Sequence, residues 1–305
     1  MKTMTLGMSE TVTSVLGLGC MRMGGKPEAE AARVIETALD CGIRLFDHAD
    51  IYDDGRSERV FARALQQTGT PRAEIQIQSK CGICPGYFDF SRDHILGAVE
   101  GSLRRLETEY LDILLLHRPD ALVEPEEVAA AFDNLFQSGK VRHFGVSNQH
   151  PRQIDLLRRY VRQPLIIHQL QFSLGHTLMI DQGLNVNMGV DGAVDRDGGI
   201  LEYCRLHDMT IQPWSPLQFG FFEGVFLDHP KFPDLNRVLH QIAGEQGVPA
   251  PAVAIAWLLR HPAGMQPILG TMNPERLRDL CRADTVRLSR PQWYELYRAA
   301  GHSLP

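Results

Sequence analysis

The 305-residue sequence lacks the long apolar runs and the apolar leader that membrane-inserted or exported proteins carry. Its strongest run, Leu111 to Leu116, falls far short of the roughly 18 residues that a membrane span needs. The first ten residues are polar, so we expect no signal peptide. Six cysteines scattered along a long chain favour reduced thiols over a disulfide framework. We therefore expect a cytoplasmic protein without a membrane partner.

An excess of charge of one sign is also missing. Lys and Arg together number 31 and Asp and Glu 37, which gives a net charge of −6 and no basic surface for nucleic acid. No internal repeat and no linker interrupts the chain, and 44% of the residues are hydrophobic, enough for a large core. We expect one domain over residues 1–305 and no nucleic-acid partner.

Short apolar runs alternate with segments of helical period, which is the pattern of a parallel sheet with crossover helices. The predicted strands are Val15–Gly19, Ile43–Phe46, Ile75–Gln78, Leu111–Leu116, Arg142–Val146, Leu165–His168, Thr210–Pro213 and Gln266–Leu269. Helical patterns between them include Glu28–Asp40, Ser57–Gln67, His94–Glu107, Glu126–Ser138 and Pro151–Tyr160. Eight such units predict an α/β fold, the (β/α)8 TIM barrel, although an open sheet can also hold eight strands.

Three further segments complete the predicted barrel. Residues 3–14 are expected to form an N-terminal hairpin over its bottom, and Ser289 to begin a C-terminal helix. Residues 172–199 and 216–233 are predicted as long loops after strands six and seven, and loops of that length are usually binding segments or lids. We expect both loops to close over a bound ligand.

A polar or otherwise functional residue follows almost every predicted strand, where a barrel of this kind builds its active site. These residues are Asp47, Lys80, His117, Ser147, Asn148, Gln169, Trp214, Ser215, Gly270 and Thr271. Each has an ordinary structural reading, such as a helix cap, a core histidine or a solvated charge. Their recurrence at one end of successive strands favours a functional site.

The residues around these positions resemble the aldo-keto reductase family in order and spacing over nearly the whole chain. Gly42 to Tyr52, followed by Gly55 and Glu58, resembles one signature, and Ser138 to Asn148 resembles another. The strands that end in Lys80 and His117 are similar to the family's lysine and histidine strands. Trp214-Ser-Pro-Leu217 and the segment from Gly270 to Arg276 resemble its cofactor loops. The resemblance implies a bacterial-type oxidoreductase that reduces aldehydes or ketones to alcohols.

The four predicted catalytic residues suit this chemistry. Tyr52 is the expected general acid, although a free phenol with a pKa of about 10 gives up its proton slowly. The charge of Lys80 should lower the pKa of Tyr52, while Asp47 keeps Lys80 ionised and oriented. His117 can donate to the carbonyl oxygen as negative charge develops there. The family resemblance implies the same four roles.

The cofactor is predicted to be NADPH, with NADH less favoured. Ser147, Asn148 and Gln169 suit a carboxamide, the resemblance places the nicotinamide amide against them, and Trp214 offers a flat stacking surface. Asn273 and Pro274 begin a helix whose free N–H groups are expected to face an anion. The full predicted cofactor set is Met21, Ser147, Asn148, Gln169, Trp214, Ser215, Pro216, Leu217, Gly270, Thr271 and Arg276; no metal site is expected.

Arg276 supports the preference for NADPH, because a cation in the first turn of a helix opposes the helix dipole unless an anion such as a 2′-phosphate binds there. Pairing with Glu275 or Asp279 is the alternative. Four residues depart from those that are common in the family at the same positions. Gly270 replaces a frequent lysine and Gln171 a frequent glutamate. Leu280 replaces a frequent asparagine and His48 a frequent threonine. These departures soften the cofactor preference without changing the reaction class.

Other interpretations remain open. Lys80 could form a Schiff base in a lyase barrel, or the chain could bind NADP without catalysis as a regulator. Gly17-x-Gly19 with Gly24 does not have the spacing of a dinucleotide fingerprint. Cys81 and Cys84 are a lone pair, which favours a structural role over zinc or redox function. Met21, Tyr87 and Phe88 are expected to line the substrate pocket and to suit an apolar or aromatic carbonyl compound.

Overall fold

The computed structural model describes all 305 residues and contains a sheet of eight parallel strands. Neighbours in the sheet follow the order β11-β10-β9-β8-β5-β4-β3-β14. Gln266 N donates to Ile211 O at 2.9 Å, which joins the two edges and nearly closes the barrel. The strands are β3 (Gly17–Gly19), β4 (Leu45–Asp47), β5 (Gln76–Cys81), β8 (Leu111–Leu116), β9 (Val141–Ser147), β10 (Leu165–Gln171), β11 (Thr210–Trp214) and β14 (Ile268–Leu269). The predicted TIM barrel is confirmed.

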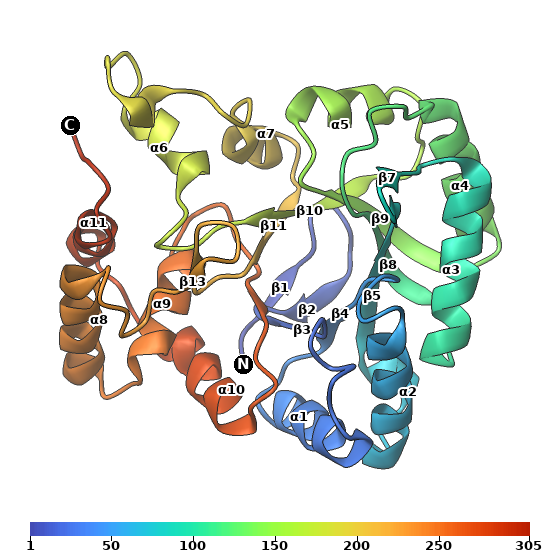
Figure 1. Cartoon of the computed structure of the whole chain (residues 1–305), viewed down its shortest axis with the longest axis horizontal. Helices are drawn as coiled ribbons and strands as arrows, with labels where there is room; N and C mark the ends of the chain where they lie inside the picture. Colours follow the sequence, from blue (N-terminus) through green and yellow to red (C-terminus); the bar gives the residue numbers. More distant parts are fainter.

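Helices surround the strands and cover their outer faces (Figure 1). They are α1 (Glu28–Asp40), α2 (Arg56–Thr68), α3 (Arg92–Leu106), α4 (Pro125–Gln137), α5 (Pro151–Arg158), α6 (Leu178–Leu184), α7 (Ile200–Leu206), α8 (Pro233–Gln246), α9 (Ala250–Leu259), α10 (Pro274–Cys281) and α11 (Arg290–Ala299). The predicted helix Glu28–Asp40 coincides with α1, and the other predicted helices differ from the observed ones by at most two residues at each end. Several strands continue beyond their predicted ends, because polar residues at the barrel mouth still pair with the next strand.

The barrel bottom is closed by the predicted N-terminal hairpin. Its strands β1 (Thr3–Thr5) and β2 (Val12–Ser14) pair antiparallel. Between them Leu6 is fully buried, in a cluster with inward-facing strand residues such as Ile113 and Ile167. Because side chains alternate along a strand, these residues fill the barrel interior while their neighbours pack on the helices.

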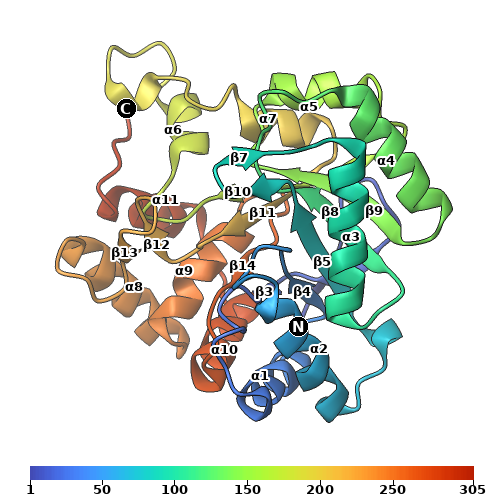
Figure 2. The same ribbon diagram turned by 45° about the vertical axis from the view of Figure 1, so that its right-hand side comes forward.

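The segment 172–199 is not the open loop that the sequence predicted. It contains α6 and a 3-10 turn at Asp191–Ala193. The apolar residues Met179 and Ile180 are buried, and Tyr297 Oη of α11 donates to Asp181 Oδ1 at 2.7 Å. Figure 2 shows α6 beside α11 and the C-terminus, away from the mouth of the barrel. The Gly, Asp and Asn content concealed this short helix, whose stability comes from tertiary packing.

Two short hairpins lie at the barrel mouth. Strands β6 (Ile83–Cys84) and β7 (Tyr87–Phe88) follow β5, and strands β12 (Gln218–Phe219) and β13 (Gly224–Val225) follow β11. The second hairpin occupies part of the predicted loop 216–233. No single helix of the structure has the length and apolar composition of a membrane span; α8 and α9 meet that test only when taken together, and they are bent by 93°.

Candidate active site

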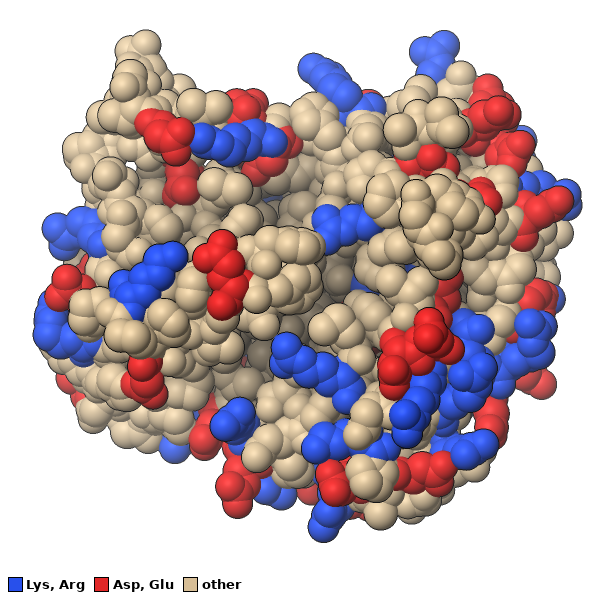
Figure 3. All heavy atoms as spheres, viewed as in Figure 1, with Lys and Arg blue, Asp and Glu red and all other residues tan.

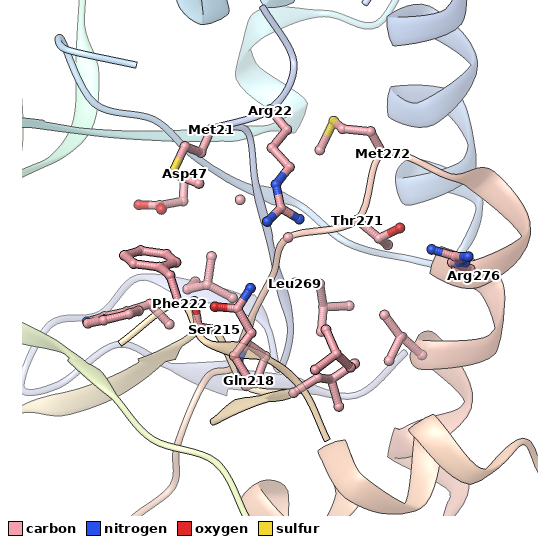
Figure 4. Close-up of a pocket in the computed structure, with 18 of the residues that line it drawn as sticks. Met21, Arg22, Asp47, Ser215, Gln218, Phe222, Leu269, Thr271, Met272 and Arg276 are labelled. Atoms are coloured by element: carbon pink, nitrogen blue, oxygen red, sulfur yellow. The ribbon is translucent and has the colours of Figure 1, made fainter. Parts of the chain in front are cut away.

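A cleft of about 1040 Å³ opens where the barrel strands end. This face of the molecule is hollowed in the middle, with Lys and Arg side chains around the hollow (Figure 3). The cleft is long: Asp47 lies at one end and Arg276, on α10, at the other (Figure 4). The predicted residues that line it are Met21, Asp47, Tyr52, His117, Ser147, Asn148, Gln169, Trp214, Ser215, Pro216, Leu217, Gly270, Thr271 and Arg276. Lys80 lies behind this wall and reaches the site through its hydrogen bonds.

Lys80 organises the catalytic end of the cleft. Its Nζ donates to Asp47 Oδ2 at 2.8 Å, to the His48 carbonyl at 2.8 Å and to Tyr52 Oη at 3.1 Å. These three bonds use all three N–H groups of the ammonium. Since Tyr52 accepts from Lys80, its own hydroxyl proton is left to point toward a substrate.

The turn that carries Tyr52 is held from behind. Asp53, Asp54 and Gly55 all have positive φ, and a Cβ on Gly55 would lie 2.6 Å from the Arg105 side chain. Arg105 Nε donates to the fully buried Glu58 at 2.7 Å, and Ser79 Oγ donates to the other oxygen of Glu58 at 2.8 Å. A buried carboxylate bonded in this way fixes α2 against β5, next to Lys80.

Burial and charge act in opposite directions on the central pair. Burial by itself lowers the pKa of Lys80, but Asp47 and Tyr52 outweigh it, so that pKa is raised and Lys80 stays charged. Burial raises the pKa of Tyr52, and Lys80 only partly opposes that effect. The expectation that Lys80 lowers the phenol pKa is thus correct in sign for the pair interaction and wrong for the net shift. Desolvation was the missing contribution.

His117 lies across the cleft from the phenol. The two rings meet edge to face with centroids 5.9 Å apart. Burial, with Lys80 and Arg118 adding to it, holds the pKa of His117 well below its usual value, so the imidazole is neutral. Its Nδ1 is buried and has no partner. A neutral ring has one N–H, which can donate to a substrate oxygen beside Tyr52.

The predicted amide-binding residues form one connected set. Trp214 Nε1 donates to Asn148 Oδ1 at 3.1 Å, and Asn148 Nδ2 donates to Ser147 Oγ at 2.7 Å. Gln169 Nε2 donates to Asp47 Oδ1 at 3.1 Å, which links this set to the catalytic residues. No protein donor reaches Gln169 Oε1, so it can accept from a carboxamide. The arrangement therefore fits a nicotinamide amide.

The loop after β11 covers part of the cleft. Ser215 has a positive φ of 50°, which turns the chain sharply after Trp214. Phe222, at the tip of the β12–β13 hairpin, stacks on Trp214 with ring centroids 5.7 Å apart and 24° between planes. One face of Trp214 is thus covered by this hairpin.

At the far end of the cleft, α10 begins as predicted, with Asn273 as its N-cap and Pro274 as its first residue, but its first-turn N–H groups are not free. Asn273 Oδ1 accepts from the N–H groups of Glu275 and Arg276, at 2.9 and 3.0 Å, and Pro274 has no N–H. The first-turn donors expected to face an anion are therefore already used by the cap. The Arg276 guanidinium forms no ion pair with Glu275 or Asp279 and faces the cleft (Figure 4). Anion binding here falls to side chains.

Sequence reasoning missed a row of buried glutamines inside the barrel. Gln78 Nε2 donates to Asp47 Oδ1 at 2.5 Å and to Gln212 Oε1 at 2.8 Å. Gln212 Nε2 donates to Gln266 Oε1 at 2.9 Å, and Gln266 Nε2 donates to the Ser14 carbonyl at 2.6 Å. The signal was present: each is a polar residue within a strand at a position where only apolar residues are expected.

The cysteine pair and the predicted aromatic wall lie outside this site. Cys81 is buried, and burial raises its pKa well above the usual thiol value, which makes it a poor nucleophile. No group of three or more His, Cys, Asp or Glu is placed to hold a metal ion. Tyr87 and Phe88 are 60% and 43% exposed on β7 and do not line the cleft, so their predicted place in the pocket is wrong.

Comparisons with known proteins agree with this geometry. A model of the aldo/keto reductase family matches residues 15–300. The chain is 37% identical over 296 residues to the 6-dehydroglucose reductase of Agrobacterium fabrum, covering 92% of each chain. It is 37% identical over 281 residues to the oxidoreductase YdhF of Escherichia coli, covering 89% of this chain and 88% of that protein.

A solved structure gives the same result at the level of the fold. The crystal structure of the thermostable aldo-keto reductase Tm1743 with the inhibitor epalrestat matches with a TM-score of 0.79 at 25% identity, over 98% of this chain and 100% of that one. The family match covers nearly the whole chain, and the relatives are aligned over nearly their full length. The chain belongs to the aldo/keto reductase family and is an NAD(P)H-dependent oxidoreductase that acts on small-molecule carbonyl compounds.

Proposed function

We propose that this protein reduces aldehydes or ketones to alcohols with NADPH and that Tyr52 is the general acid. The observation that carries the proposal is the contact between Lys80 Nζ and Tyr52 Oη at 3.1 Å, at the floor of the cleft. When bound, NADPH supplies a hydride to the carbonyl carbon. The residues of this chain supply the proton and the field around the oxygen.

The division of labour follows from the hydrogen bonds. Tyr52 donates its hydroxyl proton to the carbonyl oxygen, and Lys80 stabilises the phenolate that this leaves. Asp47 holds Lys80 in place, and neutral His117 donates to the same carbonyl oxygen as charge develops on it. Asn148, Gln169 and Trp214 are proposed to orient the nicotinamide, and Arg276 to bind the 2′-phosphate that favours NADPH.

The two alternative functions are less well supported. A Schiff-base lyase needs an accessible and unprotonated lysine, but the Lys80 side chain is fully buried, donates three hydrogen bonds and has a raised pKa. A non-catalytic regulator would have no use for the connected set of Asp47, Tyr52, Lys80 and His117. Borohydride trapping on Lys80 and a simple turnover assay test these alternatives directly.

Replacing Tyr52 by Phe tests the proposal, because it removes the acidic proton and little else. We expect kcat for carbonyl reduction to fall by about 10²–10⁴-fold, the usual contribution of a general acid. Binding of NADPH, followed by fluorescence titration, should stay within a few-fold. Retention of more than roughly a tenth of the rate would remove Tyr52 from this role.

The substrate for these measurements comes from a screen of NADPH oxidation with aldehydes, ketones and sugars. The relative from Agrobacterium fabrum is named a 6-dehydroglucose reductase, so a sugar aldehyde belongs in the screen. Absence of turnover with every carbonyl class would contradict the proposed reaction itself.

A further inference from the structure

Arg118 places an unpaired cation at the catalytic end of the cleft. It follows His117 directly at the end of β8 and lines the cleft. Its side chain is half-buried, yet none of its five N–H donors bonds to a protein acceptor and it joins no ion pair. Burying a guanidinium without acceptors is costly unless a ligand supplies them.

Three of the four other half-buried arginines in this protein have at least two hydrogen bonds each, and the fourth, Arg158, has a buried Nη1 without a partner but lies outside the cleft. Arg72 donates to Thr108, to Asp112 and to two backbone carbonyls. Arg105 donates to Glu58 and Ser102, and Arg44 donates to two backbone carbonyls. Since the chain pairs these guanidinium groups and leaves Arg118 unpaired within a cleft, its donors point to a ligand.

Aromatic rings hold Arg118 over the site without using its donors. The Cζ atom lies 5.8 Å from the centroid of the Trp214 ring and 5.9 Å from that of Phe221. Contacts of this kind attract the cation to the ring faces and leave the edges of the guanidinium plane open. Burial lowers the pKa of Arg118, and the Tyr52 phenol opposes that effect.

The other cations of the cleft lie nearer to the cofactor end. Arg276 and Arg22 flank the stretch between Thr271 and Met272 (Figure 4), and Lys26 pairs with Glu30 at 3.2 Å. The one carboxylate deep in the catalytic end, Asp47, is taken by Lys80 at 2.8 Å. Arg118 is thus the cation positioned to meet the part of a substrate that adjoins the reacting carbonyl.

We propose that Arg118 selects carbonyl substrates that carry an oxygen acceptor, a hydroxyl or a carboxylate, on the carbons next to the carbonyl. This rests on the proposed reduction and names its substrate class. A planar guanidinium can bind two such oxygens at once, while His117 and Tyr52 contact the carbonyl oxygen. The preference is for oxygen-rich aldehydes and ketones, in place of the apolar or aromatic compounds that the sequence suggested.

The test uses pairs of substrates that differ only in the oxygen substituent: glyceraldehyde against propanal, and glyoxylate against acetaldehyde. The variants are Arg118→Met, which keeps the length of the side chain, and Arg118→Lys, which keeps the charge but loses the planar group that can bind two oxygens at once. We expect Arg118→Met to lower kcat/KM for the oxygenated member of a pair by about 10- to 100-fold, the factor for a charged hydrogen bond. Propanal and acetaldehyde should change by only a few-fold, and so should the Kd for NADPH, which also reports that the variant is folded.

The outcomes are separable. A selective loss with glyceraldehyde identifies hydroxyl groups as the acceptors, and a selective loss with glyoxylate identifies a carboxylate. Equal losses for both members of each pair, in Arg118→Met and Arg118→Lys alike, would overturn the assignment, as would no loss at all. Reduction of propanal and acetaldehyde but of neither oxygenated compound by the wild-type protein would also overturn the assignment. Absence of turnover with these four compounds and with every carbonyl class in the screen would instead contradict the proposed reaction.

Discussion

At the scale of single residues, desolvation and a neighbouring charge together decide how tightly Tyr52 holds its hydroxyl proton. Burial raises the pKa of Tyr52 and Lys80 opposes this, at a separation of 3.1 Å between Nζ and Oη. A phenol with a high pKa keeps its proton at neutral pH, which suits an acid. The nearby Lys80 ammonium lowers the free-energy cost of proton transfer from Tyr52 to the substrate, because it stabilises the phenolate that results.

Replacing Lys80 by Met should therefore raise the pKa of Tyr52 further and slow reduction by about 10²-fold or more. The expected signature is a pH–rate profile for alcohol oxidation, which requires the phenolate, whose rising limb moves to higher pH. Rates measured across the neutral and alkaline range, for wild type and for Lys80→Met, supply the comparison. A variant that is slow but keeps the wild-type limb would show that Lys80 acts only by positioning.

Arg276 tests the choice of cofactor at the same scale. Because its guanidinium has no protein partner and Asn273 already caps the helix, Arg276→Ala should weaken NADPH binding by about 1.5–3 kcal/mol and NADH binding much less. Dissociation constants for both cofactors decide this, with Arg278→Ala on the same helix as the control, since Arg278 does not line the cleft. A similar loss of affinity for NADPH and NADH would contradict the proposal that Arg276 binds the 2′-phosphate.

At the scale of elements, the β12–β13 hairpin is the segment best placed to respond to the cofactor. Residues 217, 218, 222, 225 and 227 line the cleft, whereas none of residues 172–199 does. We therefore propose that only the part of the chain after β11 closes over the cofactor. Phe221 and Phe222 are 66% and 49% exposed at its tip, which makes the closure accessible to a protease.

Limited digestion with chymotrypsin provides the measurement. NADPH should slow cleavage at Phe221 and Phe222 by several-fold, because a loop held against a ligand opens less often. Cleavage at Tyr87, which is 60% exposed on β7 and outside the cleft, serves as the internal control and should not change. Equal rates at Phe221 with and without cofactor would mean that this hairpin is not a lid.

At the scale of the whole molecule, the glutamine row joins the active site to the barrel bottom. It begins at Asp47 and ends at the Ser14 carbonyl in the N-terminal hairpin, with Gln212 in the middle. We propose that residues 1–305 fold as one domain, because these bonds connect strands from both halves of the chain. Every member is buried, so each bond matters more than it would at the surface.

Gln212→Leu should lower the free energy of unfolding by about 2–5 kcal/mol, because Gln78 Oε1 and Gln266 Oε1 lose their only donor. Gln78 Nε2 and Gln169 Nε2 also lose one of their two acceptors. Urea unfolding followed by circular dichroism should still show a single transition, at lower denaturant. Gln76→Leu, at a half-buried position on the same strand as Gln78, provides the control and should cost less. Two separate transitions would contradict a single domain.

Acid should destabilise the protein through histidines that are buried and neutral. Burial, with Lys80 adding to it, lowers the pKa of His48 to about 3, against about 6.5 in an unfolded chain. Below about pH 6.5 the unfolded state binds a proton at His48 and the native state does not. The free energy of unfolding therefore falls by about 1.4 kcal/mol per pH unit for this residue, from about pH 6.5 down to about pH 3. His168, whose pKa burial also lowers to about 3, behaves in the same way.

His48→Leu isolates one of these contributions. Between about pH 7 and about pH 5, wild type should lose about 2 kcal/mol more unfolding free energy than the variant. Other groups, including Asp50, whose pKa burial raises to about 7, act equally in both proteins and cancel in the difference. Parallel losses in the two proteins would show that folding does not lower the pKa of His48.

The sequence by itself determined the barrel, the order of its strands along the chain and the identity of the residues at their ends. Hydrophobic periodicity is a local property, and polar residues after apolar runs are visible without coordinates. For the same reason Asp47, Lys80 and His117 were predictable as residues that end strands at a common face. Tyr52 lies in the loop after its strand and was predicted from the resemblance to the aldo-keto reductase signature.

Only the tertiary structure decided quantities that depend on distance and burial. The net shift of the Tyr52 pKa, the docking of α6 on α11 and the unpaired donors of Arg118 all depend on residues far apart in the chain. Desolvation and hydrogen-bond saturation are set by everything that surrounds a group. A sequence read along its length shows which group is there and not what surrounds it.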